Sequence, residues 1–249
     1  MPNLVVDIGN SAAKLAVFKG QNILYSSAQP DLDTENLLQL IKKHEVKNLI
    51  LSSVRGLPGI NEEILATNVN YVRFNAKSPV PVQNLYETPH TLGQDRLAAV
   101  VGAKALFPQE ACFVIDAGTC ITYDAIDEKG IYRGGSISPG IRMRFEAMNQ
   151  FTAKLPLVDF DPNFSASFGA NSEDALRSGV NNGAYYEAEG FAQRFLNTHP
   201  EGKIILCGGD AAFFDTKFKN SIFAHLILHE PNLVLIGLNS VVNYQNDHI

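Results

Sequence analysis

Two segments of the sequence share a pattern of residues that can bind phosphate. In residues 5–11 (VVDIGNS) and 114–120 (VIDAGTC), an apolar, β-prone run ends in Asp, with Gly two positions later and small polar side chains after it. Another β-prone run follows each glycine, over 14–18 and 121–126. A strand, a tight turn and a returning strand form a hairpin, and unpaired amides at such a turn make a site for an anion. The adjacent carboxylate can hold a cation between phosphate groups.

Because the Asp-x-Gly pattern occurs twice, we interpret the two turns as copies of one structural unit. A single Asp-x-Gly turn is most often an ordinary hairpin, but a repeated pattern indicates a duplicated structural unit. We therefore expect two related halves that bind one nucleotide between them.

A third candidate segment, Gly93-Gln94-Asp95-Arg96, lies at the expected start of a helix. A carboxylate in the first turn is stabilised by the positive end of the helix dipole, and an arginine can bind an anion through two parallel hydrogen bonds. Asp95 is therefore a candidate general base and Arg96 a candidate anion-binding residue. The same pair would also be explained by an aspartate that only complements the helix dipole, beside a solvated arginine.

The elements that would position these residues follow the same order in both halves. In the first half, hydrophobic periodicity predicts strands over 3–9, 14–19, 22–27, 48–54 and 70–74, and helices over 34–44, 60–67 and 93–106. In the second half it predicts strands over 112–117, 120–127, 131–137, 203–207 and 222–228, and helices from Pro139 and over 172–197, 209–217 and 233–245. Thr34 is the expected N-cap of its helix. The fold class is therefore α/β, with a mixed sheet covered by helices in each of two domains, 1–109 and 110–249.

The composition limits the classes of function. The chain has 249 residues, of which 45% are hydrophobic, with a formal net charge of -6 and a pI of about 5.5. It lacks the basic stripe that nucleic-acid binding requires. We expect no signal peptide and no membrane-spanning segment, because no apolar run of either kind is present. The three cysteines, Cys112, Cys120 and Cys207, lack the spacing of metal ligands and favour a reducing, cytoplasmic location.

The duplicated order of elements, with an Asp-x-Gly hairpin in each half, resembles the actin-like kinase and ATPase superfamily. In that superfamily ATP binds in a cleft between two ribonuclease-H-like domains. The sequence contains no G-x-x-x-x-G-K-[ST] motif, so a P-loop is excluded as the phosphate-binding element. Phosphoryl transfer would instead use the two hairpins, a divalent metal and a separate base.

The resemblance to one family, type III pantothenate kinase, is closer and covers nearly the whole chain. The motifs that carry it are DIGNS at 7–11, GxDR at 93–96, DAGT at 116–119, GGxIxPG at 134–140, TAxLP at 152–156, and Ser178-Gly179 after Asn171-Ser172. Together these motifs are highly specific, although none of them would be specific alone.

The resemblance implies a reaction and a set of site residues. The reaction is ATP-dependent phosphorylation of pantothenate at its primary hydroxyl to 4′-phosphopantothenate, the first step of coenzyme A biosynthesis. Asp95 matches the proton acceptor of the family. The implied ATP-binding residues are Asp7, Ile8, Gly9, Asn10, Ser11, Ala12, Ala13, Lys14 and Thr119, and the implied substrate-binding residues are Tyr86, Gly93, Gln94, Asp95, Arg96 and Ser172.

The resemblance also implies cofactors and a partner. Magnesium would enter with ATP, with Asp7 as its nearest carboxylate, and Asp116 matches the ligand of a monovalent cation, potassium or ammonium. A homodimer is implied, for which the aromatic helix over 172–197 could supply the surface, and neither nucleic acid nor a membrane is expected as a partner. Ser11 and Ser172 stand where threonine is usual in the family, and both keep the hydroxyl group.

Two other functions stay open at this point. One is phosphorylation of a different small molecule, a sugar or a carboxylic acid, by a kinase of the same superfamily. The other is a regulatory or accessory protein that kept the fold without turnover, although three aspartates at the expected site argue against it. The turn Gly208-Gly209-Asp210 could approach the adenosine of ATP or be an ordinary connection from a strand to a helix.

Overall fold

The computed structural model describes residues 1–10 and 12–248, and the chain divides into two compact units. The first unit comprises Met1–Gln109, Gly130–Arg133 and the chain from Asn232 onward. The second comprises Glu110–Lys129 and Gly134–Pro231. Among the described residues, no helix is both long and apolar enough to cross a membrane.

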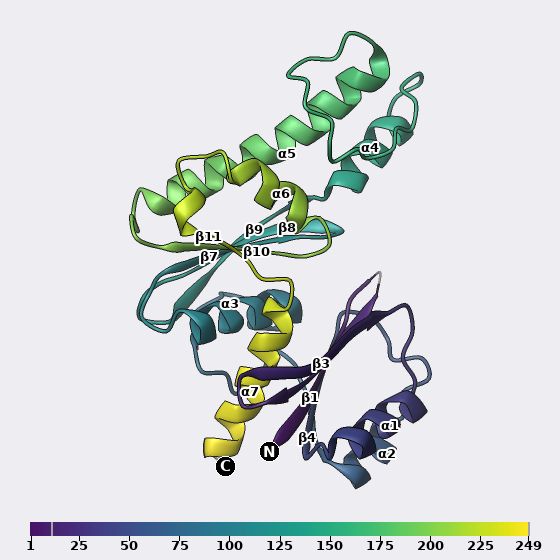
Figure 1. The fold of residues 1–249 in the computed structure, drawn as a ribbon, viewed down its shortest axis with the longest axis vertical. Helices are drawn as coiled ribbons and strands as arrows, with labels where there is room; N and C mark the ends of the chain where they lie inside the picture. The colour runs from purple at the N-terminus through teal and green to yellow at the C-terminus, as the bar shows by residue number, and fades with distance from the viewer. Residues whose placement is uncertain (11, 249) are drawn as a thin grey trace. The chain divides into compact units, whose positions relative to one another are not determined.

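The first unit contains a mixed sheet with the strand order β3-β2-β1-β4-β5. Its strands are β1 (Pro2–Ile8), β2 (Ala13–Lys19), β3 (Asn22–Gln29), β4 (Asn48–Ser53) and β5 (Asn70–Arg73). Strand β1 pairs antiparallel with β2 and parallel with β4, so the carboxyl ends of β1 and β4 lie at the same edge. Helices α1 (Thr34–His44) and α2 (Glu62–Asn68) lie on one face, and α3 (Gln94–Leu106) and α7 (Leu233–His248) lie on the other (Figure 1).

Alternation along β1 explains the two faces of this sheet. Leu4, Val6 and Ile8 are buried in the apolar cluster that includes Leu37 and Ile41 of α1. The residues between them point to the opposite face, which α7 covers. One face is therefore mainly apolar, while the other carries the buried polar side chain of Asn3 as well.

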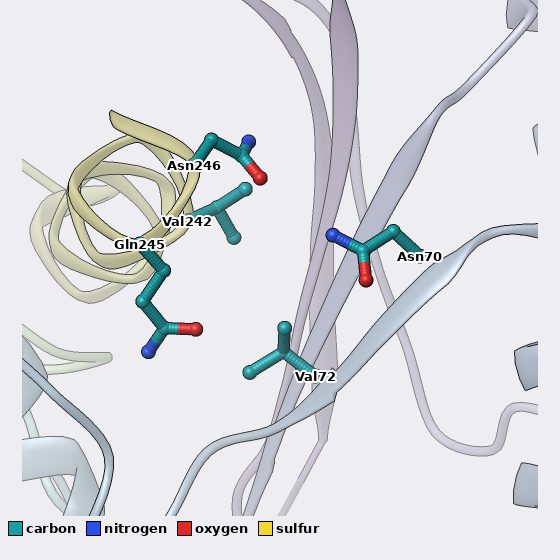
Figure 2. Close-up of a pocket in the computed structure, with 5 residues that line it drawn as sticks. All are labelled: Asn70, Val72, Val242, Gln245 and Asn246. Atoms are coloured by element: carbon teal, nitrogen blue, oxygen red, sulfur yellow. The ribbon is translucent and has the colours of Figure 1, made fainter. Parts of the chain in front are cut away.

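Buried asparagines connect α7 to the sheet of the first unit. The side-chain amide of Asn3 donates to the Oδ1 atom of Asn239 on α7 at 2.9 Å. Asn48 donates to Asn3 at 2.8 Å, and Asn70 donates to Asn48 at 3.1 Å. This chain of hydrogen bonds satisfies polar groups that would be costly to bury alone. It ends beside a cavity of about 230 Å³ between β5 and α7, shown in Figure 2, which is lined by Asn70, Val72, Val242, Gln245 and Asn246.

Helices α3 and α7 pack with their backbones in close approach at two glycines. A Cβ atom added at Gly102 would lie 2.3 Å from the carbonyl oxygen of Leu233. One added at Gly237 would lie 1.8 Å from the carbonyl oxygen of Ala98. This packing and the asparagine contacts place α7 in the first unit. The division of the chain therefore differs from the expected second domain of 110–249, in which α7 was included.

A second sheet, most of which belongs to the second unit, has the strand order β11-β10-β7-β8-β9-β6. These are β7 (Cys112–Ala117), β8 (Cys120–Ile126), β9 (Ile131–Pro139), β10 (Lys203–Cys207), β11 (Ile227–His229) and β6 (Gln83–Asn84). Strand β6 pairs only with Ile131 and Tyr132, the first residues of β9, which belong with it to the first unit. The helices of the second unit are α4 (Ile141–Gln150), α5 (Ser172–Leu196) and α6 (Ala211–Phe218). Residues of α5 and α6 share one apolar core with β7 and β8.

Several local predictions need correction. The N-cap of α1 is Asp33 and not Thr34, because the Asp33 carboxylate accepts a hydrogen bond from the amide of Asn36 at 2.7 Å. Pro139 ends β9 in an extended conformation, and α4 begins at Ile141 after Gly140. The strand expected over 222–228 is reduced to β11, because the 3₁₀ helix Ala224–Leu226 precedes it. Strand β6 and the 3₁₀ helix Pro89–Thr91 were not predicted.

Gly237→Ala is expected to lower the free energy of unfolding by about 1–3 kcal/mol, because the new methyl group would push α7 away from the Ala98 carbonyl. Urea unfolding followed by circular dichroism measures the effect. Gly190→Ala in α5 is the matched control, since the added Cβ would meet no described atom within 4 Å apart from its chain neighbours and the adjacent backbone of its own helix. Alanine favours a helix over glycine, so this control should be as stable as the unaltered chain or more so. Equal losses in both variants would contradict the close packing of α3 on α7.

Candidate active site

The first hairpin lies between β1 and β2. The amide of Gly9 donates to the carbonyl oxygen of Ala12 at 3.0 Å and closes the turn. Asp7, one residue before the end of β1, is half-buried and pairs in register with Lys14 of β2. A carboxylate and an ammonium group therefore occupy neighbouring positions at the base of the turn. Ser11, one of the expected ATP-binding residues, lies outside the described residues.

The end of β4 connects this hairpin to the start of α3. Ser53 is the register partner of Ile8 in the parallel pair. Its backbone amide donates to the Oε1 atom of Gln94 in a long hydrogen bond of 3.5 Å. The N-terminus of α3 therefore lies at the same edge of the sheet as Asp7, and the structure brings these two predicted segments together within the first unit. The hydroxyl of the wholly buried Ser52, in register with Asp7, has no hydrogen-bond partner among the described residues.

Asp95 lies in the first turn of α3, where Gly93 is the N-cap residue. Its Oδ1 atom accepts a hydrogen bond from the backbone amide of Arg96 at 2.8 Å. A Cβ atom at Gly93 would lie 2.5 Å from the same Oδ1 atom, so glycine leaves the space that the carboxylate occupies. The carboxylate is therefore held against the positive end of the helix, as expected from the sequence.

Arg96 is only 6% exposed, so the alternative of a solvated arginine is wrong. Its guanidinium carbon lies 5.8 Å from the centre of the Tyr86 ring, a cation–π geometry. The Tyr86 ring in turn stacks on that of Tyr132, with centroids 6.4 Å apart and planes 8° from parallel. Two of the predicted substrate-binding residues thus lie together, on a tyrosine that sequence reasoning missed. The sequence around Tyr132 gives no sign of this contact. Tyr132 reaches Tyr86 only because the distant strands β6 and β9 pair in the fold.

The second hairpin, between β7 and β8, has an aspartate and a glycine at the same positions as the first but a shorter turn. The amide of Gly118 donates to the carbonyl oxygen of Cys120 at 2.9 Å. Asp116 lies one residue before the end of β7 and is half-buried, as Asp7 is in β1. Thr119 is exposed at the tip. The predicted repeat is therefore present in the structure as two hairpins, each with an aspartate one residue before the end of its first strand and a glycine amide that closes the turn.

Two glycine turns pack their backbones against the second hairpin. Gly208 adopts a φ of +93°, and a Cβ there would lie 2.3 Å from the carbonyl oxygen of Ala117 and 2.5 Å from Asp116 Oδ1. The amide of Asp210 donates to that carbonyl oxygen at 2.9 Å. The amide of Gly140 donates to the carbonyl oxygen of Thr119 at 3.1 Å. The Gly208 turn therefore lies beside Asp116, a placement that the sequence had left open.

Ser172 is not brought to the second hairpin. It is the exposed first residue of α5, and the side chain of the preceding Asn171 caps the helix by accepting from the amide of Asp174. This end of α5 projects beyond the sheet of the second unit (Figure 1).

Cation binding fits these residues only together with phosphate. Among the described residues, no group of three or more His, Cys, Asp and Glu side chains could hold a metal ion. Mg²⁺ in kinases is commonly bound by one or two carboxylates together with phosphate oxygens and water. The single carboxylates Asp7 and Asp116, each beside a turn with backbone amides, suit this kind of shared site.

Comparisons with known proteins agree with the family resemblance seen in the sequence. The family model described as type III pantothenate kinase matches residues 3–194. The chain belongs to the type III pantothenate kinase family. A relative of that name from Phocaeicola vulgatus is 44% identical over 247 residues, which cover 98% of this chain and 99% of the relative. Another from Bacteroides fragilis is 42% identical over 251 residues, with 99% and 100% covered.

Solved structures show the fold. A Baf family protein from Campylobacter jejuni has a TM-score of 0.64 and 23% identity, over 98% of this chain and 99% of that one. The activator of 2-hydroxyisocaproyl-CoA dehydratase from Clostridium difficile, solved with bound ADPNP, has a TM-score of 0.56 and 12% identity, over 100% and 97%. The neighbours have the fold of actin-like ATPases and sugar kinases, so the predicted fold class of two ribonuclease-H-like domains with mixed sheets is confirmed. Membership of the pantothenate kinase family makes the chain an enzyme and not an accessory protein.

Asp210→Asn is expected to raise stability at neutral pH. Burial raises the pKa of the Asp210 carboxyl above its ordinary value, and the Arg142 guanidinium only partly opposes this shift. Because the folded-state pKa is raised, ionising this carboxyl costs folding free energy, and the cost disappears as the pH falls through the folded-state pKa. Urea unfolding over a pH series should therefore show a gain at neutral pH that vanishes in acid. An equal gain in the free energy of unfolding at every pH would show that the charge of the Asp210 carboxylate is not the cause.

Proposed function

We propose that this enzyme transfers the γ-phosphoryl group of ATP to the primary hydroxyl of pantothenate, the first step of coenzyme A biosynthesis, with Asp95 as the proton acceptor. The observation that carries the proposal is the start of α3. There a carboxylate at the helix N-terminus and a buried guanidinium are adjacent, in a chain of the type III pantothenate kinase family. An assay with purified protein, ATP, magnesium and pantothenate tests it. Phosphorylation of a sugar or of acetate, with none of pantothenate, would overturn it.

In this mechanism the side chains mainly position the reacting atoms. The Asp95 carboxylate accepts the hydroxyl proton while the hydroxyl oxygen bonds to the γ-phosphorus and the bond to ADP breaks. The carboxylate acts mainly through its position, since positioning and charge neutralisation dominate phosphoryl transfer. The tight packing against Gly93 limits where the carboxylate can move, which supports its use as a fixed base.

The two hairpins would bind ATP. On the first, the stretch Asp7–Lys14 offers turn amides and the Lys14 ammonium group, and on the second Thr119 offers its hydroxyl. Mg²⁺ would neutralise the phosphate charge, with Asp7 as its nearest carboxylate. Asp116 would hold a potassium or ammonium ion, beside the backbone carbonyl of Ala117 and the Gly208 turn.

The acceptor would be bound by the start of α3 and its tyrosine neighbour. Arg96 would pair with the pantothenate carboxylate, and Gly93 and Gln94 would border the same site. Tyr86 would contact the acceptor while its ring supports the Arg96 guanidinium. Ser172 is proposed as a further substrate contact on the strength of its sequence match alone.

A homodimer and a cytoplasmic location are also proposed. Of the aromatic side chains on α5, Phe195 is buried and Phe191 stacks on Tyr123, while Tyr186 is 60% exposed. The α5 surface around Tyr186 could therefore contact a second copy, and sedimentation showing a fully active monomer would remove this idea. All three cysteines are free, which fits a reducing compartment.

Asp95→Asn is expected to lower kcat by about 10²–10⁴-fold, the usual loss when a positioned general base is removed. ATP affinity, measured by calorimetry, should change little, because Asp95 belongs to α3 and not to either hairpin. A variant with near-normal kcat would show that the carboxylate only complements the helix dipole.

Arg96→Lys is expected to raise KM for pantothenate with little change in KM for ATP. A lysine keeps the charge but loses the planar fork that binds a carboxylate, and it also stacks less well on Tyr86. Pantothenol, which lacks the carboxylate, provides the matched control, because both forms of the enzyme should use it equally. A selective rise in KM for ATP would place Arg96 on the nucleotide.

Activity is expected to rise strongly with potassium or ammonium and weakly with sodium at equal ionic strength. The larger, weakly hydrated ion suits a site of one carboxylate and backbone carbonyls. Asp116→Asn should lower both kcat and this dependence, with an unchanged circular dichroism spectrum. Equal rates in sodium and potassium would contradict the monovalent site.

A further inference from the structure

We propose that Glu187 and Arg144 are positioning residues, which hold the turn at Pro139–Gly140 against the second hairpin and thereby set the affinity for ATP. The effect on ATP rests on the proposed role of Thr119 in binding the nucleotide. Both residues lie in the second unit, Glu187 in the middle of α5 and Arg144 in the first turns of α4.

Glu187 is the centre of a cluster of hydrogen bonds that joins α5 to α4, β8 and β9. Its Oε2 atom accepts from Arg144 at 2.8 Å, and its Oε1 atom accepts from the Tyr123 hydroxyl at 2.8 Å and from the Ser138 hydroxyl. The side chains of Arg144 and Glu187 are 20% and 28% exposed, so the ion pair is largely shielded from water. Burial raises the pKa of Glu187, but the hydrogen bonds from Ser138, Arg144 and Tyr123 outweigh it and keep the pKa below its ordinary value.

Arg144 connects this carboxylate to the backbone beside Gly140. Its Nε atom donates to the carbonyl oxygen of Pro139 at 2.8 Å, and its Nη2 atom lies 3.2 Å from the Ser138 hydroxyl oxygen. A planar guanidinium can bind a carboxylate and a carbonyl at once, which an ammonium group cannot do with the same geometry. The position of the peptide bond between Pro139 and Gly140 is thus tied to Glu187.

Gly140 carries the connection to the second hairpin. Its amide donates to the carbonyl oxygen of Thr119 at 3.1 Å, and a Cβ there would lie 2.3 Å from the carbonyl oxygen of Gly118. Among the described residues, no side chain caps α4 at Gly140. Since glycine itself offers no side chain to fix the start of the helix, the hydrogen bond from Arg144 to Pro139 supplies this restraint from within the helix.

The test measures both the affinity for ATP and the mobility of the turn at Pro139–Gly140 in each variant. Glu187→Gln keeps the shape of the side chain and removes the charge that holds Arg144. We expect the Kd for ATP to rise roughly 3- to 30-fold, the usual range for a change transmitted through a chain of contacts. KM for pantothenate should be unchanged, and hydrogen exchange at the Gly140 amide, measured without ATP, should be faster. Arg144→Lys should give the same pattern, and the double variant Glu187→Gln/Arg144→Lys should be no worse than either single one.

Glu189→Gln is the matched control. Glu189 lies on the same helix and accepts a hydrogen bond from the Tyr185 hydroxyl at 2.7 Å, so the same charge is removed from a carboxylate with a tyrosine partner. Glu189→Gln should change neither the Kd for ATP nor the rate of hydrogen exchange at the Gly140 amide. Unchanged exchange in Glu187→Gln, or an equal effect of Glu189→Gln, would overturn the proposal. If the unaltered protein does not bind ATP, the proposed function is refuted. Hydrogen exchange at the Gly140 amide would still test separately whether Glu187 holds the turn at Pro139–Gly140.

Discussion

The position of Asp95 and Arg96 depends on the packing of α3 against α7. Gly102 and Gly237 allow the two helix backbones to approach until a single added methyl group would collide with a carbonyl oxygen. Such packing leaves α3 little freedom to slide or rotate, because protein interiors are dense and resist displacement. The first turn of α3 therefore presents its carboxylate and guanidinium from a rigid support, and the buried amides of Asn3 and Asn239 hold that support to the sheet.

The two hairpins show how a duplicated element acquires different surroundings. Each has an aspartate one residue before the turn and a glycine amide that closes it. The first lies at the sheet edge where Gln94 contacts Ser53, so the helix proposed to bind the acceptor accompanies it. The second is packed by the backbones at Gly140 and Gly208, which bring a helix start and a strand end to the same turn. The same local sequence pattern is thus compatible with two different tasks.

Local sequence predicted most of the helices and strands but not all of their partners. The apolar alternation in β1 and the periodicity of α3 are local properties, so the sequence reveals them directly. The contact between Gly102 and Gly237 joins residues far apart in the chain, and no local pattern indicates it. The burial of Arg96 depends on such distant packing as well, which explains why the sequence left a solvated arginine open.

In the candidate site, too, some residues could be predicted from local sequence and others could not. The segment from Gly93 to Arg96 and the Asp-x-Gly turns could be selected because their residue types suit phosphate and carboxylate chemistry. Tyr132 and the pair of Arg144 with Glu187 could not, because an aromatic residue in a strand or an ion pair between helices has no distinctive spacing. Residues that act through their neighbours become visible only when those neighbours are known.

The assignment of α7 to the first unit has a consequence for biosynthesis. Strands β1 to β5 and α3 are translated before the second unit, and the helix that covers α3 is translated after it. During synthesis the second unit can complete its own core, whereas the face of β1 around Asn3 waits for Asn239 to satisfy its amide. The nascent chain therefore carries an unfinished first unit until α7 has been synthesised, and that exposed face is where chaperones would be needed.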